Sequence, residues 1–479
     1  MKNKRSGNHL LLYLVSAMFA VILFFLTDSI IPWCFAVVYW LIGVPFVRYL
    51  QEKYDDLLHP AGPLLIVTFL YAFASILFYY NSGGETLYGD VISTPSFVSF
   101  CVACILGELG IIIGAIIAGR QLKGRQIQNV RGSVLLRLAI PVLIVIAATL
   151  AIFFFVDIIP AFNFLSVSAY SDWALNSRVA ALEADAALPI RQILLTSMPS
   201  VLLIASGIFL IFRGKFLVRF IGIAILGANI LTGLLSGARG AMFATLCSIV
   251  IFIHYRIKRF RLPTMVLGVF CSILLLHAIA LVRSTSKLSE MVDIFVTQTT
   301  GNVSHLLDLS GSGELLVGLN LMKTIEAISA GDSKFNYGKG FVDDILCYIP
   351  RAIFPDRPLP LGDKFVVEFY PGVHEMGGGY GLFFLQDGYW SFGLIGVFVS
   401  LFAYSWALSR IYFYFKIYFD SDFMVLVYGF IYFPLVIASP RTGLMISFKS
   451  AAVLAFPFMF VLVFASLVGP PQETEKNTR

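Results

Sequence analysis

Apolar runs of membrane-spanning length recur along the whole chain. A helix that crosses a bilayer takes about 20 mostly apolar residues, and each run here carries few or no charges. The runs lie at residues 10 to 27, 30 to 47, 63 to 80, 96 to 119, 134 to 156, 191 to 212, 217 to 236, 240 to 255, 263 to 282, 381 to 407, 423 to 439 and 443 to 468. The pattern predicts an all-α polytopic integral membrane protein with about 12 transmembrane helices.

The composition agrees with this prediction and excludes several other classes. Of the 479 residues, 58% are hydrophobic and 13% are charged, whereas soluble domains are about 25% charged. These values exclude a soluble enzyme with one anchor, a disordered chain and a disulfide-stapled secreted module. The 34 Lys and Arg do not form one basic stripe, so we expect no nucleic-acid partner. Five of the six cysteines fall in apolar runs, which predicts core cysteines and no disulfide framework.

The basic residues gather in alternate loops. The connection that follows residue 255 carries Arg256, Lys258, Arg259 and Arg261, and cytoplasmic loops are enriched in Lys and Arg. The charge bias predicts that both termini are cytoplasmic. It also places two long loops on the outer side, at about 157–190 and at 283–380.

These boundaries divide the chain into four parts. We expect residues 1–282 to form transmembrane helices 1 to 9, with the outer loop at about 157–190. We expect 283–380 to form a large outer loop with short helices, 381–468 to form helices 10 to 12, and 469–479 to form a cytoplasmic tail. Such a long insert suggests a folded lid over an outward-facing site. Within it, 314–330 is helix-like, and the proline-rich stretch 350–360 cannot be helical throughout.

Several cations break the charge bias at the outer helix ends. Arg239 and Arg441 lie in short outer connections, and Arg191 and Arg283 flank spans at similar depth. Each is either an interfacial side chain or a ligand for an anion at headgroup depth. Guanidinium groups at one level are suited to bidentate binding of a diphosphate. Lys449 would lie inside the membrane on a continuous helix, facing a polar cavity or serving a structural hydrogen bond.

Candidate acids and bases follow the proline-rich stretch. His374 and Glu375 are adjacent and precede a glycine run, so either could act as a general base towards a hydroxyl; a solvated hinge is the other interpretation. Asp387 would lie just inside the outer boundary. Its aromatic neighbours Tyr389 and Trp390 suit either a sugar ring or a membrane-interface belt. The chain has no Walker A loop, no His-Glu-x-x-His and no Gly-x-Ser-x-Gly, and we expect neither a metal nor another cofactor.

Three stretches together carry a resemblance to a known family. They are Ser236-Gly-Ala-Arg239-Gly-Ala-Met, Pro350-Arg351-x-x-Phe-Pro-x-Arg357-Pro and Gly379-Tyr-Gly-Leu-Phe-Phe-Leu-Gln-Asp387-Gly-Tyr-Trp-Ser-Phe392-Gly393. With the topology, they resemble the bacterial oligosaccharide repeat-unit polymerases, the Wzy-type O-antigen polymerases of lipopolysaccharide biosynthesis. The resemblance implies a fold similar to that of the GT-C membrane glycosyltransferases. It also implies an inverting, metal-independent glycosyltransferase in the bacterial inner membrane, with its active site facing the periplasm.

The implied substrates are two undecaprenyl-diphosphate-linked glycans, a growing donor and a single repeat unit as acceptor. A chain-length regulator is a further partner that the family suggests. The acceptor hydroxyl must lose a proton and the diphosphate must leave, so a base and fixed cations are needed. We expect the base among Glu375, His374 and Asp387. The expected diphosphate ligands are Arg239, Arg283, Arg351 and Arg441. The expected substrate-binding residues are Arg191, Arg357, Tyr380, Tyr389, Trp390 and Lys449.

Two other functions remain compatible with the sequence. An O-antigen ligase would use the same donor with a lipid A core acceptor. A lipid-linked oligosaccharide flippase or secondary transporter would also use about twelve spans, although such proteins are commonly built from two related halves, and no matching halves are evident here. A non-catalytic assembly protein is the least favoured reading.

Overall fold

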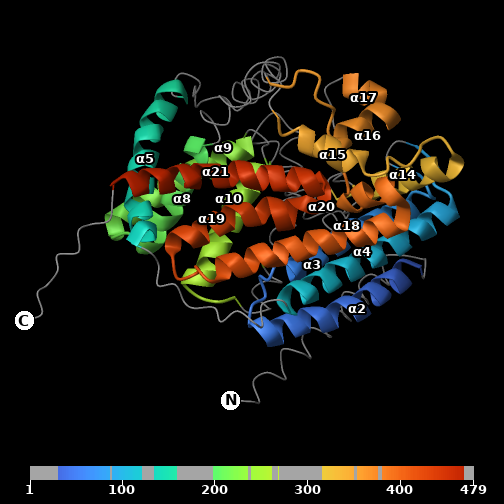
Figure 1. Ribbon diagram of the computed structural model, residues 1–479, viewed down its shortest axis with the longest axis horizontal. Coiled ribbons are helices and arrows are strands. Elements are labelled where there is room, and N and C mark those ends of the chain that lie inside the picture. The colour runs from blue at the N-terminus through green and yellow to red at the C-terminus, as the bar shows by residue number, and fades with distance from the viewer. Residues whose placement is uncertain are drawn as a thin grey trace, which may run out of the picture.

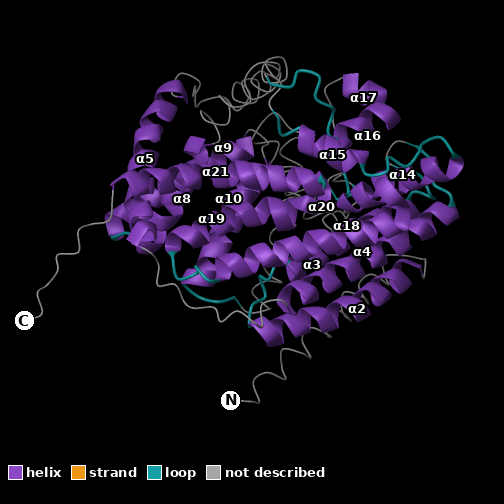
Figure 2. Ribbon diagram, in the orientation of Figure 1, coloured by secondary structure: helices purple, strands orange, loops and turns teal. Residues whose placement is uncertain are grey.

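The computed structural model describes residues 31–86, 89–120, 134–158, 198–235, 239–260, 268, 315–349, 353–375 and 380–468. This part of the chain forms helices joined by short turns (Figure 2), and its strand-like pairs are two isolated bridges, Glu85 with Val91 and Leu382 with Thr442. The principal helices are α2 (Ile31–Tyr54), α3 (Ala61–Asn81), α4 (Thr94–Arg120), α5 (Val134–Ile158), α8 (Met198–Arg213), α9 (Phe216–Leu235), α10 (Arg239–Arg256), α14 (Gly318–Ala330), α15 (Lys339–Leu346), α16 (Leu361–Phe369), α17 (Pro371–Glu375), α18 (Phe384–Lys416), α19 (Asp422–Tyr432), α20 (Ser439–Thr442) and α21 (Leu444–Val468).

Six of the described helical segments are long and apolar enough to cross a membrane. They are α2, α3, α4, α18, the segment Asp422–Thr442 and α21. Shorter apolar helices occupy the runs predicted within 134–156, 191–212, 217–236 and 240–255. The predicted runs 10–27 and 263–282 and the outer loop at about 157–190 lie outside the described residues, apart from position 268 and the end of α5 at Ile158. The prediction of a multi-pass helical membrane protein is confirmed, whereas twelve spans and the position of the termini stay predictions.

Helices α4 and α18 form the centre of one half of the bundle and run side by side (Figure 1). Their close approach depends on glycines of α4. A Cβ on Gly110 would lie 2.7 Å from the carbonyl oxygen of Phe398, and one on Gly114 would lie 2.4 Å from that of Phe402. Small residues at such contacts let helix backbones approach closely inside a membrane. The Ser405 hydroxyl also donates to the carbonyl oxygen of Ile111 at 2.7 Å, which joins the two helices by a buried hydrogen bond.

Two of the spanning segments are interrupted, which the sequence did not predict. Within α18, Phe392 and Gly393 leave helical geometry, with Gly393 at φ 64°, so Phe384–Ser391 is a short helix that precedes the longer one. The predicted span 381–407 is therefore broken, and its helix continues to Lys416. The predicted span 423–439 passes through a π-helical turn, Phe433–Ala438, into α20. Gly443, at φ 88°, then separates α20 from α21.

One end of the bundle is tied together by ion pairs. Asp422, at the start of α19, pairs with Arg213 of α8 and with Arg256 of α10. In the turn between α2 and α3, Asp56 accepts hydrogen bonds from the hydroxyls of Tyr255 and Tyr412 at 2.9 and 2.6 Å. Burial opposes the charge of Asp56, but these bonds and His254 outweigh it and lower its pKa to about 2. The charged ends of α8, α10 and α19 therefore meet at this end.

Helices α14 to α17 form a cap at the opposite end of α18 and α4, at the upper right of Figure 1. The expected helix at 314–330 is confirmed as α14, and described residues 353–360 of the proline-rich stretch are not helical. The cap is fastened to the turn between α3 and α4. Lys323 pairs with Asp90 at 2.6 Å, and the Ser93 hydroxyl donates to Glu326 at 2.6 Å. The described part of the large loop is thus folded and docked, as a lid would be.

Candidate functional site

Asp387 lies at the beginning of α18, where the cap meets the bundle. Its side chain is fully buried. Oδ2 accepts a hydrogen bond from the backbone N–H of Leu444 at 2.6 Å, and Oδ1 has no hydrogen-bond partner among the described residues. A Cβ on Gly443 would lie 3.2 and 3.3 Å from these two oxygens. The break after α20 therefore brings the backbone of α21 directly onto the Asp387 carboxylate.

Arg441 lies on α20, at the same junction. The chain bridges Leu382 to Thr442 there, and a Cβ on Gly381 would lie 2.8 Å from Cγ and 3.0 Å from Nε of Arg441. Helix α14 holds this segment in place, because the Asn320 amide donates to the carbonyl oxygen of Gly381 at 2.7 Å. Arg441 thus lies against the chain just before α18, and Asp387 lies against the chain just after α20, so both residues adjoin the bridge between Leu382 and Thr442.

Two further predicted cations lie against the cap. Arg357 donates to the carbonyl oxygens of Cys347 and Ile349 at 2.8 and 3.2 Å. Lys449 donates to the same Cys347 carbonyl oxygen at 3.2 Å, and its ammonium lies 5.7 Å from the centre of the Tyr348 ring. Cations are favourable at the carboxyl end of a helix, and Cys347 caps α15. Lys449 lies in α21, beyond the break at Gly443, and its ammonium group contacts the cap at the end of α15.

Asp344 of α15 is a buried acid that the sequence did not single out. Its carboxylate accepts the backbone N–H of Leu361 at 2.7 Å, and it is the acidic neighbour that acts electrostatically on Asp387. Burial raises the pKa of Asp344 to about 6, and Asp343 adds to the rise, although the Leu361 N–H, Lys364 and Lys449 favour the charged form. A second buried acid therefore lies within electrostatic range of Asp387.

The two other predicted bases lie elsewhere on the cap. His374 and Glu375 end the short helix α17, and both side chains are exposed. The glycine run after them, residues 376–379, is outside the described part. In the described residues, therefore, Asp387 is the predicted base that shares a junction with a predicted diphosphate ligand, Arg441.

The remaining predicted residues fall into two groups. The aromatic residues lie at the start of α18. Tyr380 precedes the helix and packs edge-on against Tyr370, with 5.1 Å between ring centres. Tyr389 and Trp390 are in its first turns, and the ring centre of Tyr389 lies 6.3 Å from that of Phe335. Arg239 is the first residue of α10, but its side chain is not described. The other predicted cations, Arg191, Arg283 and Arg351, are outside the described ranges. The convergence of the four predicted diphosphate ligands, Arg239, Arg283, Arg351 and Arg441, therefore stays a prediction.

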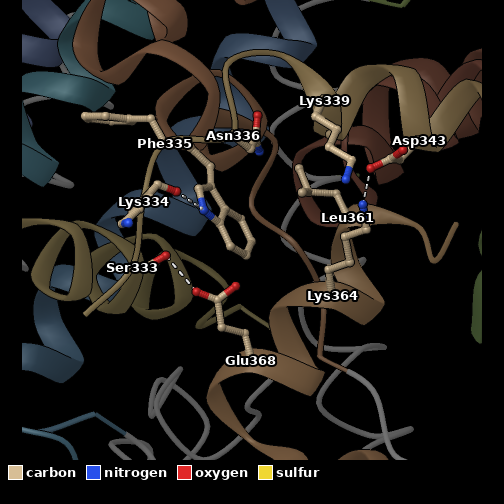
Figure 3. Close-up of a pocket in the computed structure, with 11 residues that line it drawn as sticks. Ser333, Lys334, Phe335, Asn336, Lys339, Asp343, Leu361, Lys364 and Glu368 are labelled. Atoms are coloured by element: carbon tan, nitrogen blue, oxygen red, sulfur yellow. Dashed lines mark hydrogen bonds and ion pairs between the residues drawn. The ribbon is translucent and has the colours of Figure 1, made fainter. Parts of the chain in front are cut away.

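A cavity of about 320 Å³ opens beside this junction, between the loop after α14, helices α15 and α16, and Trp390 of α18. Figure 3 shows Lys339 and Lys364 extending towards Asp343 on one side of it, and Ser333 and Glu368 together on another. The loop is held to α18 by the backbone N–H of Asn336, which donates to the Trp390 carbonyl oxygen at 2.9 Å. The indole N–H of Trp390 donates to the Lys334 carbonyl oxygen at 3.2 Å.

Sequence reasoning missed Asp344 and the cavity lysines. Their signal is local: Asp343 and Asp344 are adjacent acids in a strongly amphipathic stretch, and Lys339 precedes Asp343 by one helical turn. Such a stretch predicts a helix with one buried face, but a buried pair of acids is visible only once α16 is packed against it.

The site shows no metal-binding arrangement among the described residues, where no three His, Cys, Asp or Glu side chains come together. The five described cysteines are free thiols. Comparison of the chain with models of known protein families, with curated proteins and with solved structures found no match.

Proposed function

We propose that this protein is a membrane-embedded glycosyltransferase that joins polyprenyl-diphosphate-linked oligosaccharide repeat units, as the Wzy-type O-antigen polymerases do. In this proposal it lies in the bacterial inner membrane, with the capped end of the bundle at the periplasmic face. The donor is a growing glycan on undecaprenyl diphosphate, and the acceptor is a repeat unit on the same lipid.

The observation that carries the proposal is the junction of Asp387 and Arg441. Both lie where the interrupted helices α18 and α19–α20 meet under a folded cap, so that a lipid-anchored substrate could enter from the bilayer and its glycan could lie under the cap. Glycosyl transfer from a lipid diphosphate needs a base for the attacking hydroxyl and a cation for the leaving diphosphate. Asp387 Oδ1, which has no hydrogen-bond partner among described residues, supplies the base. Arg441 supplies the fork-shaped cation that suits phosphate oxygens.

The chemical roles follow from these positions. The attacking hydroxyl of the acceptor sugar transfers its proton to Asp387 as its oxygen bonds to the anomeric carbon of the donor. The bond between that carbon and the diphosphate oxygen breaks on the opposite face, and Arg441 meets the charge that develops there. Asp344, whose pKa is raised to about 6, carries a negative charge above that pH and then repels the charge of Asp387. Lys449 and Arg357 hold the end of α15 against the site.

A direct test uses the purified protein in nanodiscs with lipid-linked repeat units extracted from a strain that lacks it. The wild-type protein should convert these units into a ladder of longer lipid-linked glycans without nucleotide. Asp387→Asn keeps the size and the acceptor for Leu444 N–H but removes the base, and should lower the rate at least about 100-fold. A wild-type preparation that makes no ladder, or an Asp387→Asn variant as active as wild type, would contradict the proposed chemistry.

Transport of a lipid-linked glycan is the second candidate. Interrupted spanning helices are a recurrent feature of secondary transporters, and α18 and α19–α20 are both interrupted. The same nanodisc assay separates the two functions, since a flippase would leave every glycan one repeat unit long. An O-antigen ligase would instead transfer the glycan to lipid A core when that acceptor is added.

A further inference from the structure

We propose that the cavity between α15, α16 and Trp390 binds an acidic sugar residue, one that carries a carboxylate, in the glycan that this protein handles. The inference deepens the proposed function, because it assigns a substrate class to a cavity adjoining the Asp387 and Arg441 junction. It rests on the charges, the donors and the aromatic wall of the cavity.

The charges that line the cavity favour an anion. Three lysines, Lys334, Lys339 and Lys364, face two acids, Asp343 and Glu368. Lys364 pairs with Asp343, and Glu368 accepts the Ser333 hydroxyl at 2.6 Å. Lys339 has no ion-pair partner among the described residues, and Figure 3 shows its ammonium on the same side as that of Lys364. Two ammonium groups thus approach a single carboxylate, and a ligand carboxylate would balance the second positive charge.

A buried donor adds to this site. The Nδ2 atom of Asn336 is buried and has no acceptor among the described residues. Its amide cannot simply be reversed, because Oδ1 accepts the backbone N–H of Gly338 at 3.0 Å. A buried donor without an acceptor destabilises the protein, because it has lost its hydrogen bond to water. A Cβ on Gly340, a residue that lines the cavity, would lie 3.1 Å from Nδ2, so a ligand oxygen in the cavity would be within reach of this donor.

Size and aromatic lining favour a sugar over a bare phosphate. The volume of about 320 Å³ is at the lower end of ligand pockets, which run from roughly 300 to 1,000 Å³, and suits one sugar ring. Trp390 contributes aromatic wall, against which the apolar face of a sugar can pack. Arginine forks suit diphosphate better than lysines do, and Arg441 does not line the cavity.

The experiment measures binding, so it does not depend on turnover. Full-length protein in nanodiscs is titrated with the methyl glycosides of glucuronic and galacturonic acid, with those of glucose and galactose, and with inorganic pyrophosphate, by saturation-transfer NMR. At least one uronide should bind about tenfold or more tightly than its neutral counterpart. Lys339→Gln should remove most of that preference, since the variant lacks the ammonium group that would pair with the ligand carboxylate. Lys258→Gln, at an exposed lysine after α10, is the matched control and should bind like wild type.

Equal binding of uronides and neutral glycosides would overturn the assignment. So would a uronide preference that survives in Lys339→Gln. If pyrophosphate binds and Lys339→Gln abolishes that binding while uronides do not bind, the cavity takes the diphosphate of the lipid carrier and not an acidic sugar. Uronide binding that depends on Lys339, in a protein that makes no glycan ladder, would uphold the cavity assignment and reject the proposed polymerase.

Discussion

Individual residues at the junction depend on close backbone approaches that only glycine permits. Gly381 allows the Arg441 side chain to lie against the chain just before α18. Gly443, at φ 88°, allows α20 to end and lets the backbone lie against Asp387. Residues other than glycine are strained at a backbone φ of 88°, because their Cβ meets the neighbouring backbone. The positions of the candidate cation and the candidate base are therefore set by two glycines that carry no chemistry themselves.

Gly381→Ala tests this positioning of Arg441. A Cβ would lie 2.8 Å from Arg441 Cγ and 2.9 Å from Val317 Cγ1, so the guanidinium should move. We expect polymer formation to fall at least about tenfold, the equivalent of about 1.4 kcal/mol in the barrier, with the protein still in the membrane. Gly372→Ala is the control, because no atom lies within 4 Å of its Cβ position. Equal polymer formation by the two variants would mean that the position of Arg441 is unimportant.

Asp344 predicts a pH dependence of stability. Its pKa is raised from 3.8 to about 6 in the folded protein. The contribution of the protonated side chain to the free energy of unfolding is therefore fully present below pH 4 and is lost as the pH rises through 6. The loss amounts to about 3 kcal/mol. Asp344→Asn keeps the acceptor for Leu361 N–H but has no charge. Its melting temperature should match that of wild type at pH 4 and exceed it at pH 7; a difference that does not change with pH would contradict the burial of a titrating acid.

Single residues could be predicted from the sequence where a charge interrupts an apolar run. Asp387, Arg441 and Lys449 stand out in this way, and the structure places all three near the junction. Lys339, Lys364 and Asp344 lie in a polar loop where charges are ordinary. Their possible role follows from the packing of α15 against α16, and the sequence of a loop does not show that packing.

Among the described helices, α4 and α18 pack through a row of small residues. Gly107, Gly110 and Gly114 follow one another along α4 and face α18. Because the start of α18 carries Asp387, this contact also holds the candidate site against the bundle. A larger side chain in the row would separate the two helices.

Gly114→Ala tests the contact. Its Cβ would lie 2.4 Å from the Phe402 carbonyl oxygen and 2.9 Å from the backbone nitrogen of Trp406. Overpacking of this kind lowers the free energy of unfolding by about 1–3 kcal/mol. The melting temperature of the purified protein should fall. The matched control is Gly227→Ala in α9, where no atom lies within 4 Å of the Cβ position. Two variants with the same melting temperature would show that α4 and α18 do not pack closely in solution.

Hydropathy predicts where spanning helices lie but not where they break. The sequence predicts continuous helices at 381–407 and 423–439, since each run is long enough to span and carries at most one charge. The break at Gly393 and the π-helical turn before α20 arise from local geometry, for which Pro434, Pro440 and Gly443 are the visible signals. These breaks create the junction, so the sequence singled out Asp387 and Arg441 as candidates without predicting the geometry that brings them to one place.

On the scale of the whole molecule, the two ends of the bundle differ. One end holds the ion pairs of Arg213, Arg256 and Arg259. The other carries the cap, α14 to α17 (Figure 1). The excess of basic residues on cytoplasmic loops predicts that the first end is cytoplasmic and that the cap is outside.

Cysteine labelling tests this orientation. Gly372→Cys, on the exposed face of α17, should react with a membrane-impermeant maleimide in intact cells whose outer membrane is made permeable. Lys258→Cys, at the other end, should react only after the inner membrane is opened. Wild-type protein measures the background from native cysteines, and the reverse pattern would place the cap, and with it the junction, in the cytoplasm.

The central claim is that this protein extends lipid-linked glycans, and the glycans of a strain that lacks it test the claim most directly. We predict that its surface glycan carries a single repeat unit, and that the wild-type gene restores long chains. Unmodified core with polymer accumulating on undecaprenyl diphosphate would point to a ligase instead, and repeat units trapped on the cytoplasmic leaflet would point to a flippase. Glycans identical to those of the parent strain would contradict the account altogether.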